Sequence, residues 1–384
     1  MCPRKCEVAK MRKQSKPAGA GKPDGKLKGY FKNMKTVTKV DYATYLGVIM
    51  TFAVVMACQS AGLLNRQVTG MLVPICCYIC MAVSLNLTVG ILGELSLGHA
   101  GFMSVGAFSG IIASMSLGFT GAGDVARLAL AIVVGAVMAA VAGVIVGVPV
   151  LRLRGDYLAI VTLAFGEIIK ELINCLLVGF DENGLHIRFN YDGNSVMADL
   201  GLTENGVEII KGAQGAAGNE KIATFTAGFV LVMITMVIVL NLVRSRTGRA
   251  VMAIRDNRIA AESVGINVTK YKLTAFVISA ALAGAAGALF GLNYSSVSAA
   301  QFDFNTSILV LVYVVLGGLG NMWGSVIAAV VLYVLPEALR QFADYRMLVY
   351  AIVLILVMLA THNDRLRALL GKIIPRRKGA ALNG

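Results

Sequence analysis

The sequence has too few charged residues for a soluble protein of its size. Only 15% of its 384 residues are Asp, Glu, Lys or Arg, and 57% are hydrophobic, whereas soluble domains carry about 25% charged residues. The apolar residues occur in runs of about 20, which match the thickness of a bilayer's hydrocarbon core. Glycine is abundant, with 42 residues, and small residues let spanning helices pack closely. We therefore predict an all-α fold, a polytopic membrane helical bundle, and exclude a soluble enzyme.

Motifs for hydrolytic chemistry are also missing. The sequence has no Walker lysine motif, no GxSxG or HExxH motif and no paired-carboxylate pattern. Five of its seven cysteines lie inside apolar runs, where cysteine behaves as a small hydrophobe. Cys77 and Cys80 form a CxxC, but no second Cys or His pair accompanies it. We expect no metal, no cofactor and no enzyme activity, so that any ATP hydrolysis belongs to a separate subunit.

The apolar runs predict about ten transmembrane segments. The eighth is short, so it either spans part of the bilayer or joins its neighbour across a break. Their approximate limits are 43–64, 68–89, 98–118, 125–150, 156–178, 224–243, 271–291, 307–317, 325–342 and 347–361.

The net charge of +14 is local in origin. Twelve Lys and Arg precede Asp41, seven lie between Arg244 and Lys272, and six follow His362. Basic residues confined to the flanks and loops of spanning helices indicate the cytoplasmic side and suit contact with anionic membrane lipid. We therefore expect no nucleic acid partner.

This charge distribution orients the predicted bundle in an inner (plasma) membrane. With the N-terminus in the cytoplasm, ten spans place Arg152, Arg154 and the 244–272 loop on the same side. The segment 179–223, with seven acidic and three basic residues, then lies in the periplasm. We expect basic cytoplasmic tails at 1–42 and 362–384, and a transmembrane domain at 43–361.

Two glycine-rich interruptions, Gly90–His99 and Gly317–Gly324, divide the apolar runs. Helix breaks at membrane depth are tolerated where they face protein or a wet cavity, and paired breaks indicate a transport path. Two tight cytoplasmic turns are the alternative. Polar residues in or near spans predict function, although interfacial turns or a satisfied polar patch would also explain them. The candidates for a translocation path are Glu94, Ser96, His99, Glu167 and Asn321.

The stretch from Arg244 to Lys272 is charged and competent to form a helix. Thr247 is expected to cap its start and Gly265 to end it. At helical spacing, one arc collects small residues, which favours docking into a cleft of a partner protein. A helix lying on the membrane surface is the alternative, but such helices usually carry bulky apolar residues. The arc contains Ala250, Ala253, Ile254, Asn257, Ala260, Ala261 and Val264.

Four stretches of the sequence resemble a known family, the permease subunits of branched-chain amino acid ABC transporters of the LivM type, in a class that includes urea permeases. The stretches are Gly90–Phe108, Leu151–Lys170, Thr247–Gly291 and Val314–Arg340. The resemblance implies an importer built from two permease subunits, two cytoplasmic ATPase subunits and a periplasmic substrate-binding protein. The segment 179–223 is longer and more acidic than the corresponding loop of the family.

The resemblance also implies that the 244–272 loop docks on the ATPase. The family's coupling motif falls on Ile259, Ala260 and Ala261, followed by Gly265, and Ile259 stands where the general pattern has Glu. The candidates for polar contacts to the ATPase are Arg249, Arg255, Asp256 and Glu262, with Asn257 beside them.

Two other functions are alternatives to that of a branched-chain amino acid permease. A urea or amide permease would share the architecture. A proton-coupled secondary transporter would instead use Glu94, His99 and Glu167 for coupling. A purely structural scaffold explains neither the glycine-rich breaks nor the alanine-faced loop.

Overall fold

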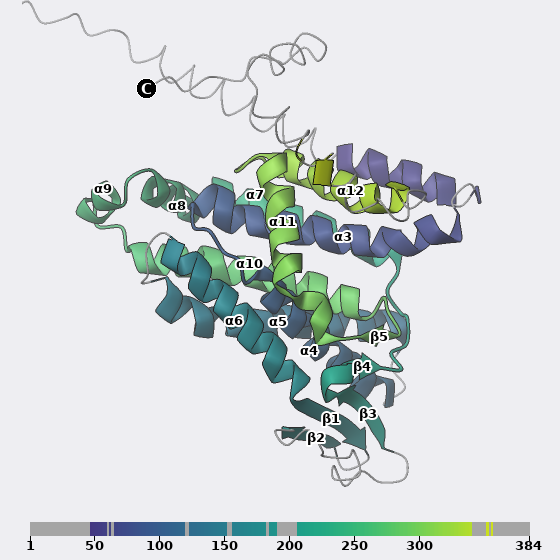
Figure 1. The fold of residues 1–384 in the computed structure, drawn as a ribbon. Helices are drawn as coiled ribbons and strands as arrows, with labels where there is room; N and C mark the ends of the chain where they lie inside the picture. Colours follow the sequence, from purple (N-terminus) through teal and green to yellow (C-terminus); the bar gives the residue numbers. More distant parts are fainter. Residues whose placement is uncertain are drawn as a thin grey trace, which may run out of the picture. The chain divides into compact units, whose positions relative to one another are not determined.

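The structure is a computed structural model that describes residues 47–59, 61–62, 65–119, 123–151, 156–181, 184–189, 206–339 and the single positions 351, 352 and 355. The predicted tails, Arg152, Arg154 and most of the last apolar segment lie outside these residues. The chain divides into two compact units, Met1–Leu63 and Leu64–Gly384. The described part of the first unit contains a short apolar helix, Gly47–Gln59, and the second unit contains the labelled elements of Figure 1.

Within the described residues, five helices are long and apolar enough to cross a membrane. Helix α6, the shorter α11 and α12, and the small polar helices α8 and α9 complete the helical part. The protein is therefore a polytopic helical membrane protein, as predicted. The long helices are α3 (Arg66–Asn86), extended by a π-helical turn at Leu87–Leu92, α4 (His99–Phe119), α5 (Asp124–Val150), α7 (Phe225–Arg244) and α10 (Val268–Gly291); the others are α6 (Asp156–Asn174), α8 (Arg246–Asp256), α9 (Arg258–Ser263), α11 (Phe304–Gly317) and α12 (Met322–Ala338).

Helix α10 is the centre of the second unit, because its small residues admit close neighbours (Figure 1). The Cα of Gly284 faces Gly135 and Ala139 of α5 on one side, and it lies against Gly106 of α4 on the other. Nearly every residue from Ser279 to Gly291 is buried. In a membrane such van der Waals packing, and not the hydrophobic effect, holds helices together.

A small antiparallel sheet lies at one end of the helices, with strand order β2-β1-β3-β4-β5. Strand β5, which follows α10, pairs with β4 through Ala216 opposite Val297. The sheet therefore joins the chain after α6 to the chain between α10 and α11. Its strands are β1 (Leu176–Asp181), β2 (Gly184–Phe189), β3 (Val207–Lys211), β4 (Ala216–Ala217) and β5 (Ser296–Val297).

The prediction of one transmembrane segment over residues 156–178 is therefore wrong at its C-terminal end. Helix α6 stops at Asn174, and Leu176 begins a strand whose Leu177 and Val178 are buried in the sheet. A short apolar run reads equally well as a helix end or as a strand. Pairing with β2 and β3 on both sides selects the strand.

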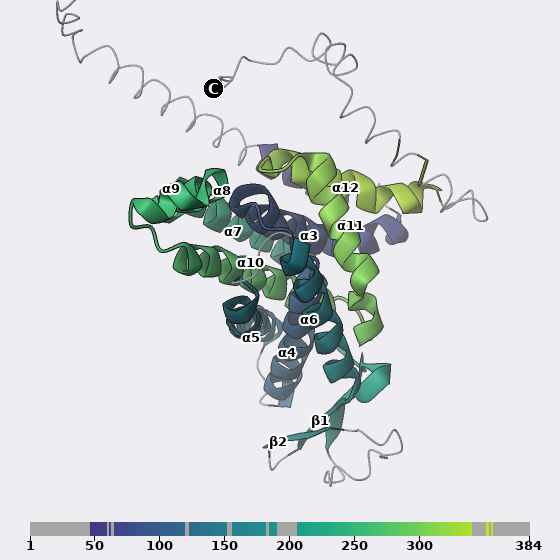
Figure 2. The same cartoon turned by 60° about the vertical axis from the view of Figure 1, so that its left-hand side comes forward.

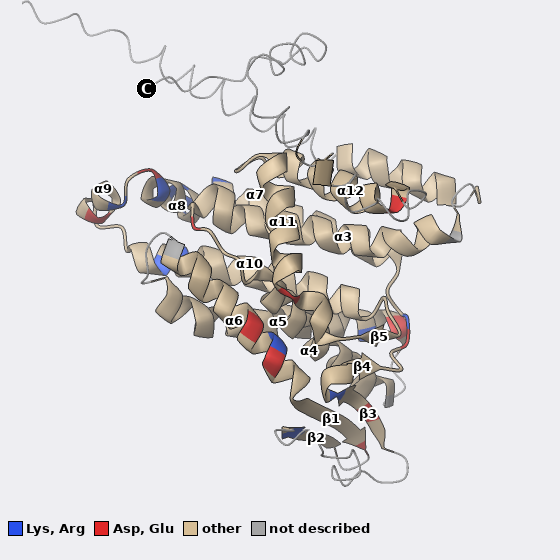
Figure 3. Cartoon of the chain, in the orientation of Figure 1, with Lys and Arg blue, Asp and Glu red and all other residues tan. Residues whose placement is uncertain are grey.

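The sheet and the α8–α9 segment lie at opposite ends of the second unit, as both views show (Figures 1 and 2). Charged residues gather at these ends and along α6, whereas the other long helices are almost free of charge (Figure 3). This is the distribution expected for helices whose middle portions lie in hydrocarbon.

The packing around α10 predicts that Gly284 tolerates no side chain. A Cβ at this position would overlap the Cβ of Ala139 and lie 2.5 Å from the Gly135 carbonyl oxygen. Overpacking of this kind costs about 1–3 kcal/mol or more. We expect Gly284→Ala to lower the midpoint of thermal unfolding in detergent, measured by loss of the monodisperse chromatography peak. Gly70→Ala in α3 is the control, because a Cβ there meets no atom within 4 Å; equal stability of the two variants would contradict this account.

Candidate functional site

The two glycine-rich interruptions, far apart in the sequence, meet in space. A Cβ at Gly90 would overlap the backbone nitrogen of Gly320, so only glycine permits this approach. Asn86 joins the two segments, because its Oδ1 accepts a hydrogen bond from the Gly320 amide at 2.8 Å and its Nδ2 donates to the Ser325 Oγ at 2.8 Å. The predicted breaks therefore form one polar junction within an apolar unit.

The first interruption begins with a change of helix type. Helix α3 continues as a π-helical turn over Leu87–Leu92 and ends at Gly93, whose φ of 78° is left-handed. The Glu94 amide donates to the Thr88 carbonyl at 3.1 Å. Residues 93–98 of the Gly90–His99 linker then connect to α4 without regular structure. π-Helical turns are rare and concentrate at functional sites.

The second interruption joins α11 to α12. Gly318 and Gly320 both have positive φ angles, 94° and 78°. A Cβ at Gly317 would overlap the backbone of Gly324, so the ends of the two helices approach backbone to backbone. Helix α11 has only 14 residues, in agreement with the prediction of a short eighth segment beside a break. Asn321 is exposed at the start of α12 and makes no side-chain capping bond there.

Glu94 forms an ion pair with Lys272 near the start of α10. The two side chains are 15% and 8% exposed, so the pair is largely shielded from solvent. The sequence analysis identified Glu94 as a candidate site residue but not Lys272, because Lys272 is one of several basic residues in the 244–272 loop. A sequence cannot reveal that the turn after α9 brings α10 back against the linker.

Ser96 and His99 are both buried, each 1% exposed. His99 shares a hydrogen bond with the Ser84 Oγ at 2.8 Å, and the Ser279 Oγ donates to the Ser84 carbonyl at 2.6 Å. These bonds join α3, α4 and α10. The Ser96 Oγ has no hydrogen-bond partner among the described residues.

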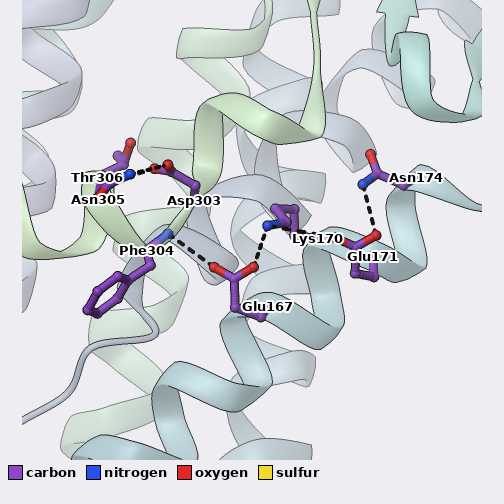
Figure 4. Close-up of polar contacts among 8 residues, drawn as sticks. All are labelled: Glu167, Lys170, Glu171, Asn174, Asp303, Phe304, Asn305 and Thr306. Atoms are coloured by element: carbon purple, nitrogen blue, oxygen red, sulfur yellow. Dashed lines mark hydrogen bonds and ion pairs between the residues drawn. The ribbon is translucent and has the colours of Figure 1, made fainter.

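Glu167 lies in a separate polar cluster on α6 (Figure 4). It forms an ion pair with Lys170, and its Oε1 accepts a hydrogen bond from the Phe304 amide at 3.1 Å. Phe304 is the first residue of α11, and Asp303 caps this helix by accepting a hydrogen bond from the Thr306 amide at 2.9 Å. Glu171 lies 3.7 Å from the Lys170 Nζ. The predicted polar patch on α6 therefore fixes the start of α11.

The linker and the α6 cluster are connected through close packing of α4 on α6. The Leu97 amide donates to the Thr162 Oγ1 at 3.1 Å, and a Cβ at Gly98 would overlap the Thr162 carbonyl. These elements meet α11 around Gly101, Gly166 and Glu167, where they pack too closely to leave a cavity for a water molecule. Glu94, Ser96 and His99 thus lie between the first break and the start of α4, Glu167 lies in the α6 cluster, and Asn321 lies at the second break.

The predicted single helix between Arg244 and Lys272 is two helices. Ser245, and not Thr247, caps α8 by accepting from the Gly248 amide at 3.1 Å. Asn257 breaks the helix and caps α9, accepting from the Ala260 amide at 3.0 Å. Gly265, with a φ of 85°, follows α9 as predicted.

This break also changes the predicted small-residue face. Ile254 and Ala261 are buried together with Val268 in a small core, whereas Ala253 and Ala260 are exposed. Within residues 246–265, the most exposed large apolar side chains are Ile259 and Val264, at 80% and 81%. The predicted polar residues Arg249, Arg255, Asp256 and Glu262 are also exposed.

Further polar residues of the junction were missed in the sequence. Asn86 and Ser325 are fully buried inside apolar helices. A polar residue within a spanning segment is a signal of function in itself, and Asn86 could have been found this way. Ser325 could not, because serine is common in spanning helices.

Interrupted helices that meet inside a polytopic unit are the architecture of membrane transport proteins. The family model described as "Branched-chain amino acid transport system / permease component" matches residues 67–358. The chain belongs to this family.

Several curated proteins are similar to the chain. The high-affinity branched-chain amino acid transport system permease protein LivM of Salmonella typhimurium is 37% identical over 287 residues, 73% of this chain and 66% of that protein. LivM of Escherichia coli is 37% identical over 289 residues, with the same coverage. The permease protein BraD of Pseudomonas aeruginosa is 28% identical over 257 residues, 66% of this chain and 79% of that protein. The chain thus spans slightly less than two thirds of the length of the LivM proteins, and no solved structure matches it significantly.

The shielded ion pair predicts a strong coupling between Glu94 and Lys272. Removing one member of such a pair leaves an uncompensated buried charge and costs about 3–5 kcal/mol. We expect Glu94→Gln and Lys272→Met each to lower the free energy of unfolding in detergent–SDS titrations, and the double variant to recover most of the loss.

The pair Arg258–Glu262 on α9 is the control. Its side chains are 36% and 49% exposed, so Arg258→Met is expected to change stability by less than about 1 kcal/mol. Additive losses in the Glu94–Lys272 cycle would show that the two charges do not interact.

Proposed function

We propose that the chain is a membrane-spanning permease subunit of an ATP-driven importer of branched-chain amino acids. The observation that carries this proposal is the family match over residues 67–358. The relatives named for this substrate class are permease components and not enzymes. The subunit is proposed to work with a second permease, cytoplasmic ATPase subunits and a periplasmic substrate-binding protein.

The α8–α9 segment is the proposed contact with the ATPase. It protrudes at one end of the second unit (Figure 2), and it exposes Ile259 and Val264 as well as the charged residues Arg249, Asp256 and Glu262. Exposed apolar residues rimmed by charges are typical of protein interfaces. Ala261 and Gly265 hold the segment in shape, one in its small core and one in a turn that requires positive φ.

The orientation of the subunit follows from its charge. Seven Lys and Arg lie between Arg244 and Lys272 at one end, and the acidic segment 179–223 supplies the sheet at the other. The positive-inside bias therefore favours a cytoplasmic α8–α9 end and a periplasmic sheet end, with both termini in the cytoplasm of a bacterial inner membrane.

The junction of the two breaks is the proposed moving part of the translocation path. ATP binding would displace the α8–α9 segment, and the difference in free energy between outward-open and inward-open states would come from the nucleotide. Glu94, Ser96, His99 and Asn321 lie at or beside the breaks, and Glu167 holds the start of α11, the helix that leads to the second break. A proton-coupled mechanism gains no support from this geometry, since Glu94 is paired with Lys272 and His99 is buried against Ser84.

Reconstitution of the complete complex in liposomes tests the function. With ATP inside and the binding protein outside, we expect uptake of radiolabelled leucine, isoleucine or valine that stops when the ATPase site is blocked. Uptake of urea but not of these amino acids would support the related permease class. Uptake driven by a pH gradient without the ATPase would refute the importer proposal.

Cysteine labelling tests orientation and docking together. In a variant without native cysteines, we expect Ile259→Cys to react with a membrane-impermeant maleimide from the cytoplasmic side only, and to be protected when the ATPase is bound. Ile187→Cys on β2 is the control, because Ile187 is 57% exposed at the sheet end and should react from the opposite side without protection. Labelling of Ile259→Cys from the periplasm would overturn both claims.

A further inference from the structure

Arg255 connects α8 to the Gly90–His99 linker by a hydrogen bond to the backbone. Its Nη1 donates to the Gly90 carbonyl at 3.0 Å. This carbonyl lies within the π-helical turn that ends α3, where the last carbonyl groups lack partners inside the helix. A cationic donor at a helix C-terminus also interacts favourably with the helix dipole. Arg255 is thus a C-terminal cap of α3, supplied from a helix more than 150 residues later in the chain.

The contact is close as well as polar. Gly93 has a left-handed φ, and a Cβ there would lie 2.7 Å from the Cγ and 3.2 Å from the Cδ of Arg255. The aliphatic part of Arg255 therefore lies directly on the Gly93 backbone. The neighbouring Asp256 orients the guanidinium, because its Oδ1 accepts from Nε at 3.2 Å and from Nη2 at 3.1 Å.

Lys272, which follows the α8–α9 segment in the sequence, holds the same linker at a second point. It is buried at the start of α10 and pairs with Glu94, one residue after Gly93. Ile254, Ala261 and Val268 form a small core that joins α8, α9 and the start of α10. The linker is therefore held at two points, by Arg255 and by Lys272, and both residues belong to helices that share this small core.

Gly90 carries the connection onward to the second break. Its carbonyl oxygen accepts from Arg255, while its Cα lies against the Gly320 nitrogen. Asn86, one helical turn earlier, binds both Gly320 and Ser325. A displacement of α8 that keeps the bond from Arg255 therefore moves Gly90, and the close contact and the Asn86 bonds carry that movement to the α11–α12 turn.

We propose that Arg255 is a positioning residue that transmits the displacement of α8 to both helix breaks through the Gly90 carbonyl. This inference rests on the proposed function. It assigns to Arg255 a role inside the permease, in place of the contact to the ATPase that the sequence resemblance implies for it. The charged residues of the α8–α9 segment then have two roles. Arg249 and Glu262 are proposed to contact the ATPase, and Arg255 binds the linker.

The test compares Arg255→Ala with wild type in the complete complex reconstituted in liposomes. We expect the ATPase to bind and hydrolyse ATP as in wild type, while the number of amino acids transported per ATP falls about tenfold, within the range typical of coupling between sites. Arg255→Lys keeps a charged donor and should recover part of this ratio. Arg246→Ala is the matched control, because Arg246 is exposed on the same helix and makes no hydrogen bond or ion pair to the described part of the linker.

A second variant changes the contact without changing charge. Gly93→Ala places a methyl group against the Arg255 stem, at a backbone angle that alanine rarely adopts. We expect it to lower transport per ATP in the same direction as Arg255→Ala. Agreement of both variants would exclude a simple effect of removing positive charge from the ATPase side.

Hydrogen–deuterium exchange distinguishes transmission from structural support. In wild type, trapping the ATP-bound state should change exchange in peptides covering both α8–α9 and residues 87–98. In Arg255→Ala, the α8–α9 response should remain and the 87–98 response should disappear. An unchanged 87–98 response, a wild-type transport ratio, or an equal loss in Arg246→Ala would overturn the inference. Failure of wild type to transport would instead refute the proposed function.

Discussion

The second unit depends on one constraint: backbone groups released by two helix breaks must find hydrogen-bond partners. Buried peptide groups without a partner are costly, so irregular backbone inside a protein is stable only where other groups supply hydrogen bonds. Asn86 meets this need for the second break by accepting from the Gly320 amide, and Arg255 meets it for the first by donating to the Gly90 carbonyl. Glycine at positions 90 and 320 then lets the two breaks touch, so that each supports the other.

The sequence predicted what depends on composition and local pattern. Runs of apolar residues located the spanning helices, and clusters of glycine located both breaks, because glycine is needed wherever backbones approach or φ is positive. The turn at Gly265, directly after α9, followed from the same reasoning. These features are local, and their physical causes are contained in a few adjacent residues.

The sequence did not predict what tertiary pairing decides. Leu176–Phe180 is apolar enough to extend α6, and it becomes a strand because β2 and β3 pair with it. Thr247 and Ser245 are both good helix caps, and only the turn after α7 selects Ser245. The partner of Glu94 is Lys272, 178 residues away, and no spacing rule connects them. Asn257 interrupts a helix that would otherwise continue, which moved Ala253 and Ala260 out of the packed face.

The two ends of the second unit differ in how they are joined. At the sheet end, backbone pairing of β4 with β5 and the salt bridge between Arg127 and Glu220 tie separate parts of the chain together. At the other end, the linker is held by side-chain contacts of Arg255 and Lys272 and by no strand pairing among the described residues. Local opening at the linker therefore disrupts fewer backbone hydrogen bonds than opening of the sheet end does. We therefore expect conformational change to begin where the breaks meet α8, with the sheet end acting as the fixed support.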